Sequence, residues 1–156
     1  MENKYFTPDI EDLCIGYECE YNFARAYTDE FDFVKIGYKD VTPGKGGYTN
    51  ELTHMIHLID DGAAAIRVPY LTKEQIEAEG WEYKHTYKDL IYYDERIFFE
   101  KRKSDKKEDI WKLQLEYYKN NLVRIHIDQG HDWKRFLGEC KDINTFRKII
   151  KLLNIN

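Results

Sequence analysis

Two histidines and two aspartates lie close together in the last third of the chain and could perform acid–base chemistry. His126 and His131 have Asp128 and Asp132 as neighbours, and an imidazole beside a carboxylate is a common general acid–base pair. No Ser or Cys nucleophile with a recognisable local motif accompanies them. A small hydrolase or nuclease that uses His126 and His131 is therefore one hypothesis, although we expect binding rather than catalysis.

Cations and aromatic side chains are interleaved in the same region, in a pattern that could bind an anionic ligand. Guanidinium and ammonium groups pair with phosphates, and aromatic rings can stack on a base. The candidate ligand-binding residues here are Lys112, Arg124, His126, Trp133 and Arg135. The alternative is that they are ordinary residues of the solvent-exposed face of a sheet.

Lys45 is a further candidate ligand-binding residue because it lies in the loop Gly44-Lys45-Gly46-Gly47. The glycines would let backbone N–H groups approach an anion. The loop lacks the G-x-x-x-x-G-K-[ST] spacing of a P-loop, so a plain loop without a ligand is the alternative.

His54-x-x-His57 with Asp60 and Asp61 would place two imidazoles and a carboxylate on one face of a helix, as a metal site requires. The pattern is not the H-E-x-x-H motif, and residues 50–59 fit either a helix or a strand. We expect two surface histidines rather than a metal site, and the sequence indicates no cofactor.

The elements that must position these residues are mostly strands. The 156 residues include 13 Tyr, 8 Phe and 3 Trp, a composition typical of sheets rather than of a helix bundle. Alternating patterns predict strands at 14–23, 32–40, 63–70, 81–87, 90–93, 96–101, 110–118, 122–128 and 135–141. Helices are expected at 73–79 and 144–153. The predicted fold class is α+β, with a mostly antiparallel sheet built from hairpins, a short central helix and a C-terminal helix, in a single domain 1–156 with a possible N-terminal arm at 1–12.

Capping residues and a glycine predict where these helices begin and end. Thr72 and Gln75 form a capping box, Gly80 ends the first helix, and Asn144 is expected to cap the second. The apolar stripe of the second helix consists of Phe146, Ile149, Ile150 and Leu153.

The hairpin of 110–118 and 122–128 should have one apolar and one polar face. We predict that Trp111, Leu113, Leu115, Tyr117, Val123, Ile125 and Ile127 point one way, and that Lys112, Gln114, Glu116, Arg124 and His126 point the other.

Three further patterns carry structural expectations. In 81–87 we expect Trp81, Tyr83, His85 and Tyr87 to share one side. A second hairpin is expected around Asp94-Glu95, and Pro69 should put its strand at a sheet edge or end it. The chain has more aromatic side chains than one small core can bury. We expect the remaining ones to form a dimer interface or a ligand slot, and therefore expect a homo-oligomer.

The net charge of −5 is unevenly divided. Residues 1–78 have 7 Lys/Arg and 15 Asp/Glu, giving −8, whereas residues 79–156 have 17 and 14, giving +3. The composition gives no basic surface for duplex DNA, but the asymmetry could serve a small anion or head-to-tail self-association. The three cysteines form no C-x-x-C pair, which predicts reduced thiols. The sequence has no apolar run of membrane length and no signal peptide, so we expect the protein in the cytoplasm.

Three segments resemble a family. Residues 4–20, 67–81 and 136–155 are similar to small uncharacterised proteins encoded by phages and prophages of Bacteroidetes-type bacteria. The resemblance implies a small viral accessory protein in the cytoplasm of the bacterial host. Such proteins often block a host protein or sequester a host immune signal such as a cyclic nucleotide.

The leading hypothesis is a phage accessory protein that acts by binding and sequesters a nucleotide-type immune signal in a pocket of a homo-oligomer. The alternative is a protein-interaction module that inhibits a host or phage protein. The two would be distinguished by whether Lys112, Arg124 and His126 line a concave pocket or an open surface.

Overall fold

The computed structural model describes residues 4–23, 29–37, 51–88, 91–104, 106, 109–118, 122–130 and 133–155, with the side chains of 51 and 133–135 excepted. The chain divides into two compact units. Residues 5–69 form the N-terminal unit, and residues 1–4 with 70–156 form the C-terminal unit. The expectation of one domain stays a prediction, whereas the α+β class with antiparallel sheets is confirmed.

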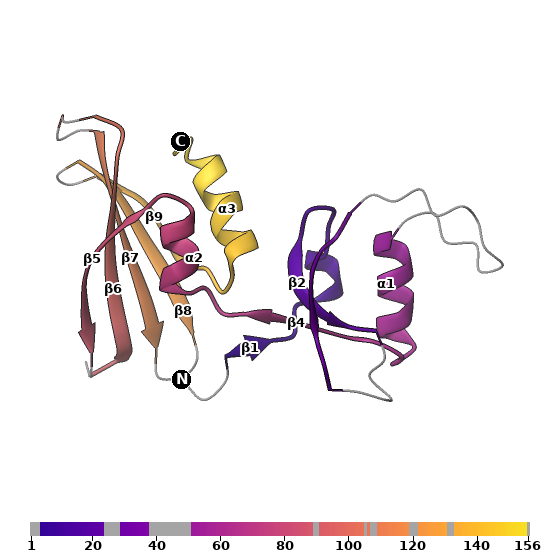
Figure 1. Cartoon of the computed structure of the whole chain (residues 1–156). Coiled ribbons are helices and arrows are strands. Elements are labelled where there is room, and N and C mark those ends of the chain that lie inside the picture. The colour runs from indigo at the N-terminus through magenta and orange to yellow at the C-terminus, as the bar shows by residue number, and fades with distance from the viewer. Residues whose placement is uncertain are drawn as a thin grey trace. The chain divides into compact units, whose positions relative to one another are not determined.

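The N-terminal unit is a four-stranded antiparallel sheet with one helix (Figure 1). In sheet order its strands are β1 (Tyr5–Phe6), β4 (Ala65–Pro69), β2 (Glu18–Asn22) and β3 (Asp32–Lys35). A 3-10 turn at Ile10–Asp12 follows β1, and helix α1 spans Glu51–Asp60. Its core contains Leu13, Tyr17, Cys19, Ile36, Met55, Ile66 and Val68.

The described part of the ambiguous segment 50–59, from residue 51 on, is helical because Leu52, Met55, Ile56 and Ile59 follow the helical period and pack on that core. Pro69 is the last residue of β4, which lies between β1 and β2. Of the two expectations for this proline, the end of the strand is therefore the one confirmed.

The C-terminal unit is a five-stranded antiparallel sheet whose strands follow one another in chain order. They are β5 (Glu82–Lys88), β6 (Tyr93–Arg102), β7 (Ile110–Tyr118), β8 (Val123–Gln129) and β9 (Trp133–Glu139). Helices α2 (Lys73–Ala78) and α3 (Ile143–Leu152) belong to the same unit.

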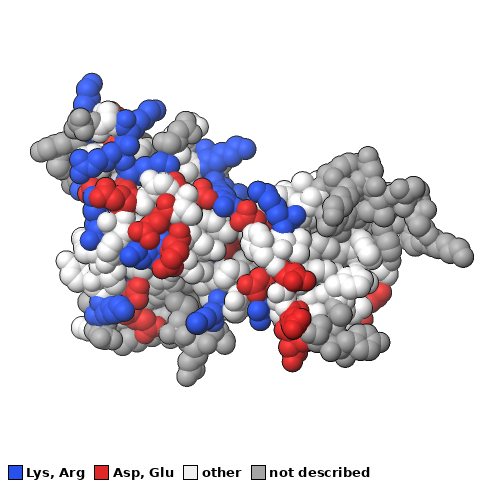
Figure 2. Space-filling view, viewed as in Figure 1, with Lys and Arg blue, Asp and Glu red and all other residues white. Residues whose placement is uncertain are grey.

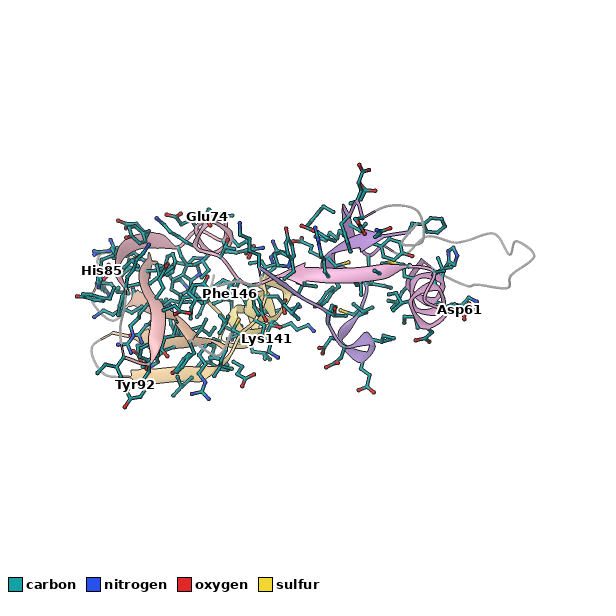
Figure 3. All side chains as sticks on the ribbon, turned by 90° about the horizontal axis from the view of Figure 1, so that it is seen from below. Asp61, Glu74, His85, Tyr92, Lys141 and Phe146 are labelled. Atoms are coloured by element: carbon teal, nitrogen blue, oxygen red, sulfur yellow. The ribbon has the colours of Figure 1, made fainter. Side chains whose placement is uncertain are left out.

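Both helices pack on one face of this sheet (Figure 1). The apolar face predicted for the hairpin of β7 and β8 is confirmed: five of its seven residues are almost fully buried, Tyr117 is buried and Trp111 is partly buried. Ile76 of α2 and Phe146 of α3 lie in the same core, and Phe146 points from its helix into the side chains of the sheet (Figure 3). The opposite face is where the predicted polar side chains lie.

The capping box of α2 is present as predicted. The Thr72 hydroxyl accepts a hydrogen bond from the Gln75 backbone N–H, and the Gln75 side chain accepts one from the Thr72 N–H. Gly80 follows the helix at φ +83°, a conformation that favours glycine.

The cap of α3 differs from the prediction. The N-cap is Asp142, whose carboxylate accepts hydrogen bonds from the backbone N–H groups of Asn144 and Thr145. Asn144 lies in the first turn and is buried. Asp and Asn are equally good caps, so composition alone could not choose between two candidates two residues apart.

Two β-bulges overturn two other predictions. Lys84 is an extra residue in β5, so that Tyr83 lies opposite the buried Phe99 whereas His85 lies opposite Phe98 on the other face. Trp81, Tyr83, His85 and Tyr87 therefore do not share one side.

The expected hairpin around Asp94-Glu95 is also wrong. Both residues lie inside β6, where a register shift falls between Tyr93 and Glu95. The turn between β5 and β6 lies before Tyr93 instead. Turn-forming acidic residues can occupy a bulge, where the backbone leaves regular strand geometry without reversing direction.

Candidate functional site

The candidate site is the open face, which we define as the face of the five-stranded sheet opposite α2 and α3. Within the described part of the C-terminal unit, no helix packs on it. Strand register assigns it Glu82, His85, Tyr87, Tyr93, Arg96, Phe98, Glu100, Arg102, Ile110, Lys112, Gln114, Glu116, Tyr118, Arg124, His126, Asp128, Leu137 and Glu139. His85 points away from the core that contains Phe146 (Figure 3).

Glu116 is the centre of a polar cluster on the open face. Its side chain accepts hydrogen bonds from the Tyr118 hydroxyl at 3.0 Å and from the Gln114 amide. Nε of Arg96 lies 3.3 Å from its Oε1 atom, as an ion pair without hydrogen-bond alignment. Only 5% of Glu116 is exposed, so these neighbours take the place of water around a carboxylate.

Two tyrosines extend this cluster. The Tyr118 and Tyr93 hydroxyls are 3.4 Å apart, and the guanidinium of Arg96 lies 4.3 Å from the Tyr93 ring centroid. The guanidinium carbon of Arg124 lies 5.5 Å from the centroid of the Tyr118 ring. Burial, together with hydrogen bonds to Tyr93 and Glu116, raises the pKa of Tyr118 to about 12, so its hydroxyl is protonated at neutral pH.

An aromatic cluster lies beside the polar one. The rings of His85 and Phe98 are stacked with centroids 4.5 Å apart, and Tyr87 meets both rings edge-on. Tyr87 is 54% exposed, as is Leu137 on β9 at the other edge of the sheet. The open face therefore offers accessible apolar atoms at both edges.

The structure brings three of the predicted ligand residues onto this face. Lys112 is exposed and lies between Glu100 and Asp128 of the neighbouring strands. Arg124 lies between Glu116 and Glu139. Each of these two cations thus has an acidic residue on both sides.

His126 is the third. Its Nε2 atom lies 3.2 Å from Oδ1 of Asp128, close enough for an ion pair when the imidazole is protonated. The two groups are not aligned for a hydrogen bond, and among the described residues this buried nitrogen has no hydrogen-bond partner. The His126–Asp128 pair of the acid–base hypothesis is therefore present, whereas His131 and Asp132 lie outside the described residues.

The side chains of the other predicted ligand residues lie outside the described part of the structure. The backbone of Trp133 and Arg135 is part of strand β9, but their side chains are not described. Lys45 and the whole loop Gly44-Lys45-Gly46-Gly47 also lie outside the described residues.

The His54-x-x-His57 pattern lies on α1, as a metal site would require. His57 instead contacts Asp61 through Nε2 at 3.1 Å. In the described ranges, no group of three His, Cys, Asp or Glu side chains is arranged to hold a metal ion.

A cation between two rings holds the N-terminal unit together. The Arg67 guanidinium lies 4.1 Å from the Tyr5 ring centroid and 3.9 Å from that of Phe31, and Nε donates to Oε2 of Glu20 at 2.7 Å. These contacts join β1, β2, β4 and the segment before β3. We interpret them as structural, because they tie the short strand β1 to the sheet.

The three cysteines differ in burial. Cys14 is exposed, Cys19 and Cys140 are buried, and none forms a disulfide. Burial raises the pKa of Cys19 from 9.0 to about 11 and also raises that of Cys140, so the folded state disfavours the thiolate form of both.

Sequence reasoning missed the part played by Arg96 and by the aromatic residues of β5 and β6. Tyr87, Tyr93 and Phe98 are not among the ligand residues that the sequence predicts, but they lie on the open face. The two bulges change the phase of alternation, and Asp94-Glu95 in the middle of an apolar run was the sequence signal for one of them.

Comparisons with known protein families, with curated proteins and with solved structures find no match. None of the described helices is long and apolar enough to span a membrane. The functional argument therefore rests on the open face itself.

Proposed function

We propose that this protein is a binding protein without catalytic activity, and that its open face contacts a partner protein. This is the interaction-module hypothesis of the sequence analysis. In the phage setting that the three sequence segments imply, the partner would be a host or phage protein that is blocked by the contact.

One observation carries this proposal: tyrosine, arginine, histidine and phenylalanine side chains contact one another on a sheet face that none of the described helices of their unit covers. Aromatic residues and arginine dominate the energetics of protein interfaces. Because Glu116 and Phe98 already hold their neighbours in place, binding would cost little side-chain entropy.

The charges of the open face favour a protein partner over a phosphate-bearing ligand. Register and ion pairs place five cations on it, Lys84, Arg96, Arg102, Lys112 and Arg124, and five acids, Glu82, Glu100, Glu116, Asp128 and Glu139. A polyphosphate or cyclic nucleotide would meet as much negative as positive charge. Sequestration of a nucleotide-type signal, with Lys112, Arg124 and His126 among its ligands, therefore stays a second hypothesis.

Affinity capture from bacterial lysate tests the proposal. The bait variants are wild type, a face variant with Tyr87→Asp and Leu137→Asp, and a control with Ile15→Asp. The three substituted side chains are all exposed, so each substitution should leave the fold intact. We expect a stoichiometric protein that is retained by wild type and by the control but lost from the face variant.

Captured proteins that bind all three baits equally would contradict the use of the open face. Thermal unfolding with a panel of cyclic oligonucleotides and ADP-ribose derivatives gives the second arm of the test. A compound that protects wild type, but not Arg124→Ala, would support the nucleotide hypothesis in place of the protein partner.

A further inference from the structure

The two described sheets have four edge strands, and three of these have features that oppose the addition of another strand. β5 and β9 border the five-stranded sheet, and each contains an extra residue, Lys84 in β5 and Arg135 in β9. A β-bulge at a sheet edge interrupts the ladder of hydrogen bonds that an added strand needs. β1 has only two residues. The fourth edge strand, β3, differs from the other three.

β3 offers a regular free edge. Its four residues pair with β2 in continuous register, and they include no proline. In the part of the chain that the structure describes, no strand pairs with its other side. Nζ of Lys35 lies 3.4 Å from Oε1 of Glu18 on β2, so this charge is held toward the neighbouring strand rather than over the free edge.

A hydrogen bond at the end of β3 shows which of its backbone groups point to the free edge. The Ile36 N–H donates to the Tyr17 carbonyl at 2.9 Å, so the backbone of Ile36 faces the β2 side. Backbone groups of successive residues in an antiparallel strand point alternately to its two sides. Those of Val34 therefore also face β2, whereas the N–H and C=O groups of Phe33 and Lys35 face the free edge. Such groups, two residues apart, are what an added antiparallel strand binds.

The side chains of β3 alternate between the two faces of its sheet. Val34 lies opposite Cys19 and packs on the core of the N-terminal unit, and Asp32 shares this face. Phe33 and Lys35 lie on the other face, where Phe33 is 70% exposed. An added strand would therefore have Phe33 as its neighbour on the face away from the core.

The order of charges along β3 favours a second copy of the same strand at this edge. Asp29 and Glu30 are exposed and precede the strand, which begins with Asp32 and ends with Lys35. Antiparallel pairing of two copies places the acidic start of one strand beside the basic end of the other. Parallel pairing would place acid beside acid, which is unfavourable.

The net charge of the N-terminal unit opposes contact between copies at long range. The unit has 12 Asp/Glu and 5 Lys/Arg, giving −7, and Figure 2 shows acidic side chains gathered over the lower part of its visible face. Two copies therefore repel at a distance, and salt screens this repulsion. Association through paired strands should then persist or strengthen as the salt concentration rises, whereas a contact between opposite charges would weaken.

We propose that the β3 strands of two copies pair in antiparallel orientation about a two-fold axis at Phe33. Phe33 then lies opposite Phe33 of the second copy, and these residues exchange the hydrogen bonds of their edge-facing N–H and C=O groups. Cross-strand aromatic pairs are favourable, and the pair removes both exposed rings from water. Two four-stranded sheets become one sheet of eight strands, and the contact closes as a dimer.

This inference does not depend on the proposed function, because β3 belongs to the N-terminal unit and the open face to the C-terminal unit. A contact through one short strand is small, so the dimer should form only at high protein concentration.

Sedimentation velocity over a range of protein concentrations tests the proposal with two substitutions at one residue. Lys35→Pro removes an N–H group at the free edge, whereas Lys35→Thr keeps it, and both remove the ion pair with Glu18. Because this N–H points away from β2, the proline removes no hydrogen bond within the sheet. We expect Lys35→Thr to dimerise like wild type and Lys35→Pro to raise the dissociation constant about tenfold or more.

Phe33→Asp tests the centre of the contact. It places two carboxylates opposite each other at the two-fold axis, so the dimer should be lost. The control Ile15→Asp adds the same charge at another exposed apolar residue of the N-terminal unit and should dimerise like wild type. Circular dichroism of each variant separates a loss of the contact from a loss of the fold, and the Phe33 and Ile15 variants decide if Lys35→Pro does not fold.

Four results would overturn the proposal. Wild type could remain monomeric up to about 1 mM, or a folded Lys35→Pro could dimerise as tightly as Lys35→Thr. Phe33→Asp could dimerise like Ile15→Asp. The wild-type dimer could also dissociate when the salt is raised from about 0.1 M to about 1 M, which would indicate a contact between opposite charges instead.

Discussion

Glu116 is the residue on which the order of the open face depends. It is almost fully buried although none of the described helices covers this face, and Tyr118, Gln114 and Arg96 all contact its carboxylate. A buried charge is stable only with such partners, so the cluster should respond as one unit to a change in Glu116.

We predict that Glu116→Gln lowers the free energy of unfolding by about 1–3 kcal/mol, because the amide cannot replace the ion pair and leaves polar neighbours without a partner. Urea denaturation measures this change. Glu139→Gln, at an exposed position opposite Arg124 on the same face, is the control and should shift stability by less than about 0.5 kcal/mol. Equal effects of the two variants would mean that the cluster does not organise the face.

The thiol of Cys19 gives a prediction about pH. Its pKa is raised by burial from 9.0 to about 11, so the folded state favours the neutral thiol. The thiol therefore contributes its full stability below pH about 9, and this contribution is lost as the pH rises toward about 11. The stability difference between wild type and Cys19→Ala, measured by urea denaturation at several pH values, should shrink over this window. A difference that is constant from pH 8 to pH 11 would contradict burial of the thiol, as would alkylation of Cys19 in the folded protein as fast as that of Cys14.

At the scale of elements, α3 depends on its cap. Asp142 accepts hydrogen bonds from two backbone N–H groups and from the Thr145 hydroxyl, and the helix it begins covers the core face of the sheet. The loss of this cap should affect the whole C-terminal unit.

We predict that Asp142→Ala lowers the free energy of unfolding by about 1–2 kcal/mol, whereas Asp142→Asn retains most of the stability, since Asn is an equally good N-cap. Thermal or urea unfolding distinguishes the variants. If the Asn variant is as unstable as the Ala variant, the negative charge rather than the cap is what α3 requires.

The elements that sequence reasoning predicted well are those with unbroken periodicity. The hairpin of β7 and β8 alternates without interruption, so its faces, including Lys112, Arg124 and His126, could be assigned residue by residue. The capping box of α2 likewise depends only on local geometry.

The prediction was wrong where one extra residue changed which side chains of a strand point to which face. The extra residue Lys84 moves Tyr83 and His85 to opposite faces, and the bulge near Asp94 turns an expected hairpin into a single strand. The sequence around Lys84 carries no local signal for a bulge, because the neighbouring strand determines where the extra residue fits, and the signal at Asp94-Glu95 is the same as that of a turn. For this reason the sequence did not reveal the aromatic residues of the candidate site.

At the scale of the whole molecule, the two units differ in charge. The N-terminal unit has 12 Asp/Glu and 5 Lys/Arg, giving −7, and the C-terminal unit has 17 Asp/Glu and 19 Lys/Arg, giving +2. The open face belongs to the C-terminal unit. The expected homo-oligomer stays a prediction.

The central claim is that the open face binds a partner protein, and one binding measurement tests it most directly. The captured partner, once purified, is titrated by calorimetry with wild type, with the face variant Tyr87→Asp and Leu137→Asp, and with the control Ile15→Asp. We predict a dissociation constant at least about 100-fold larger for the face variant and within about twofold of wild type for the control. A face variant that binds as tightly as wild type would contradict the account.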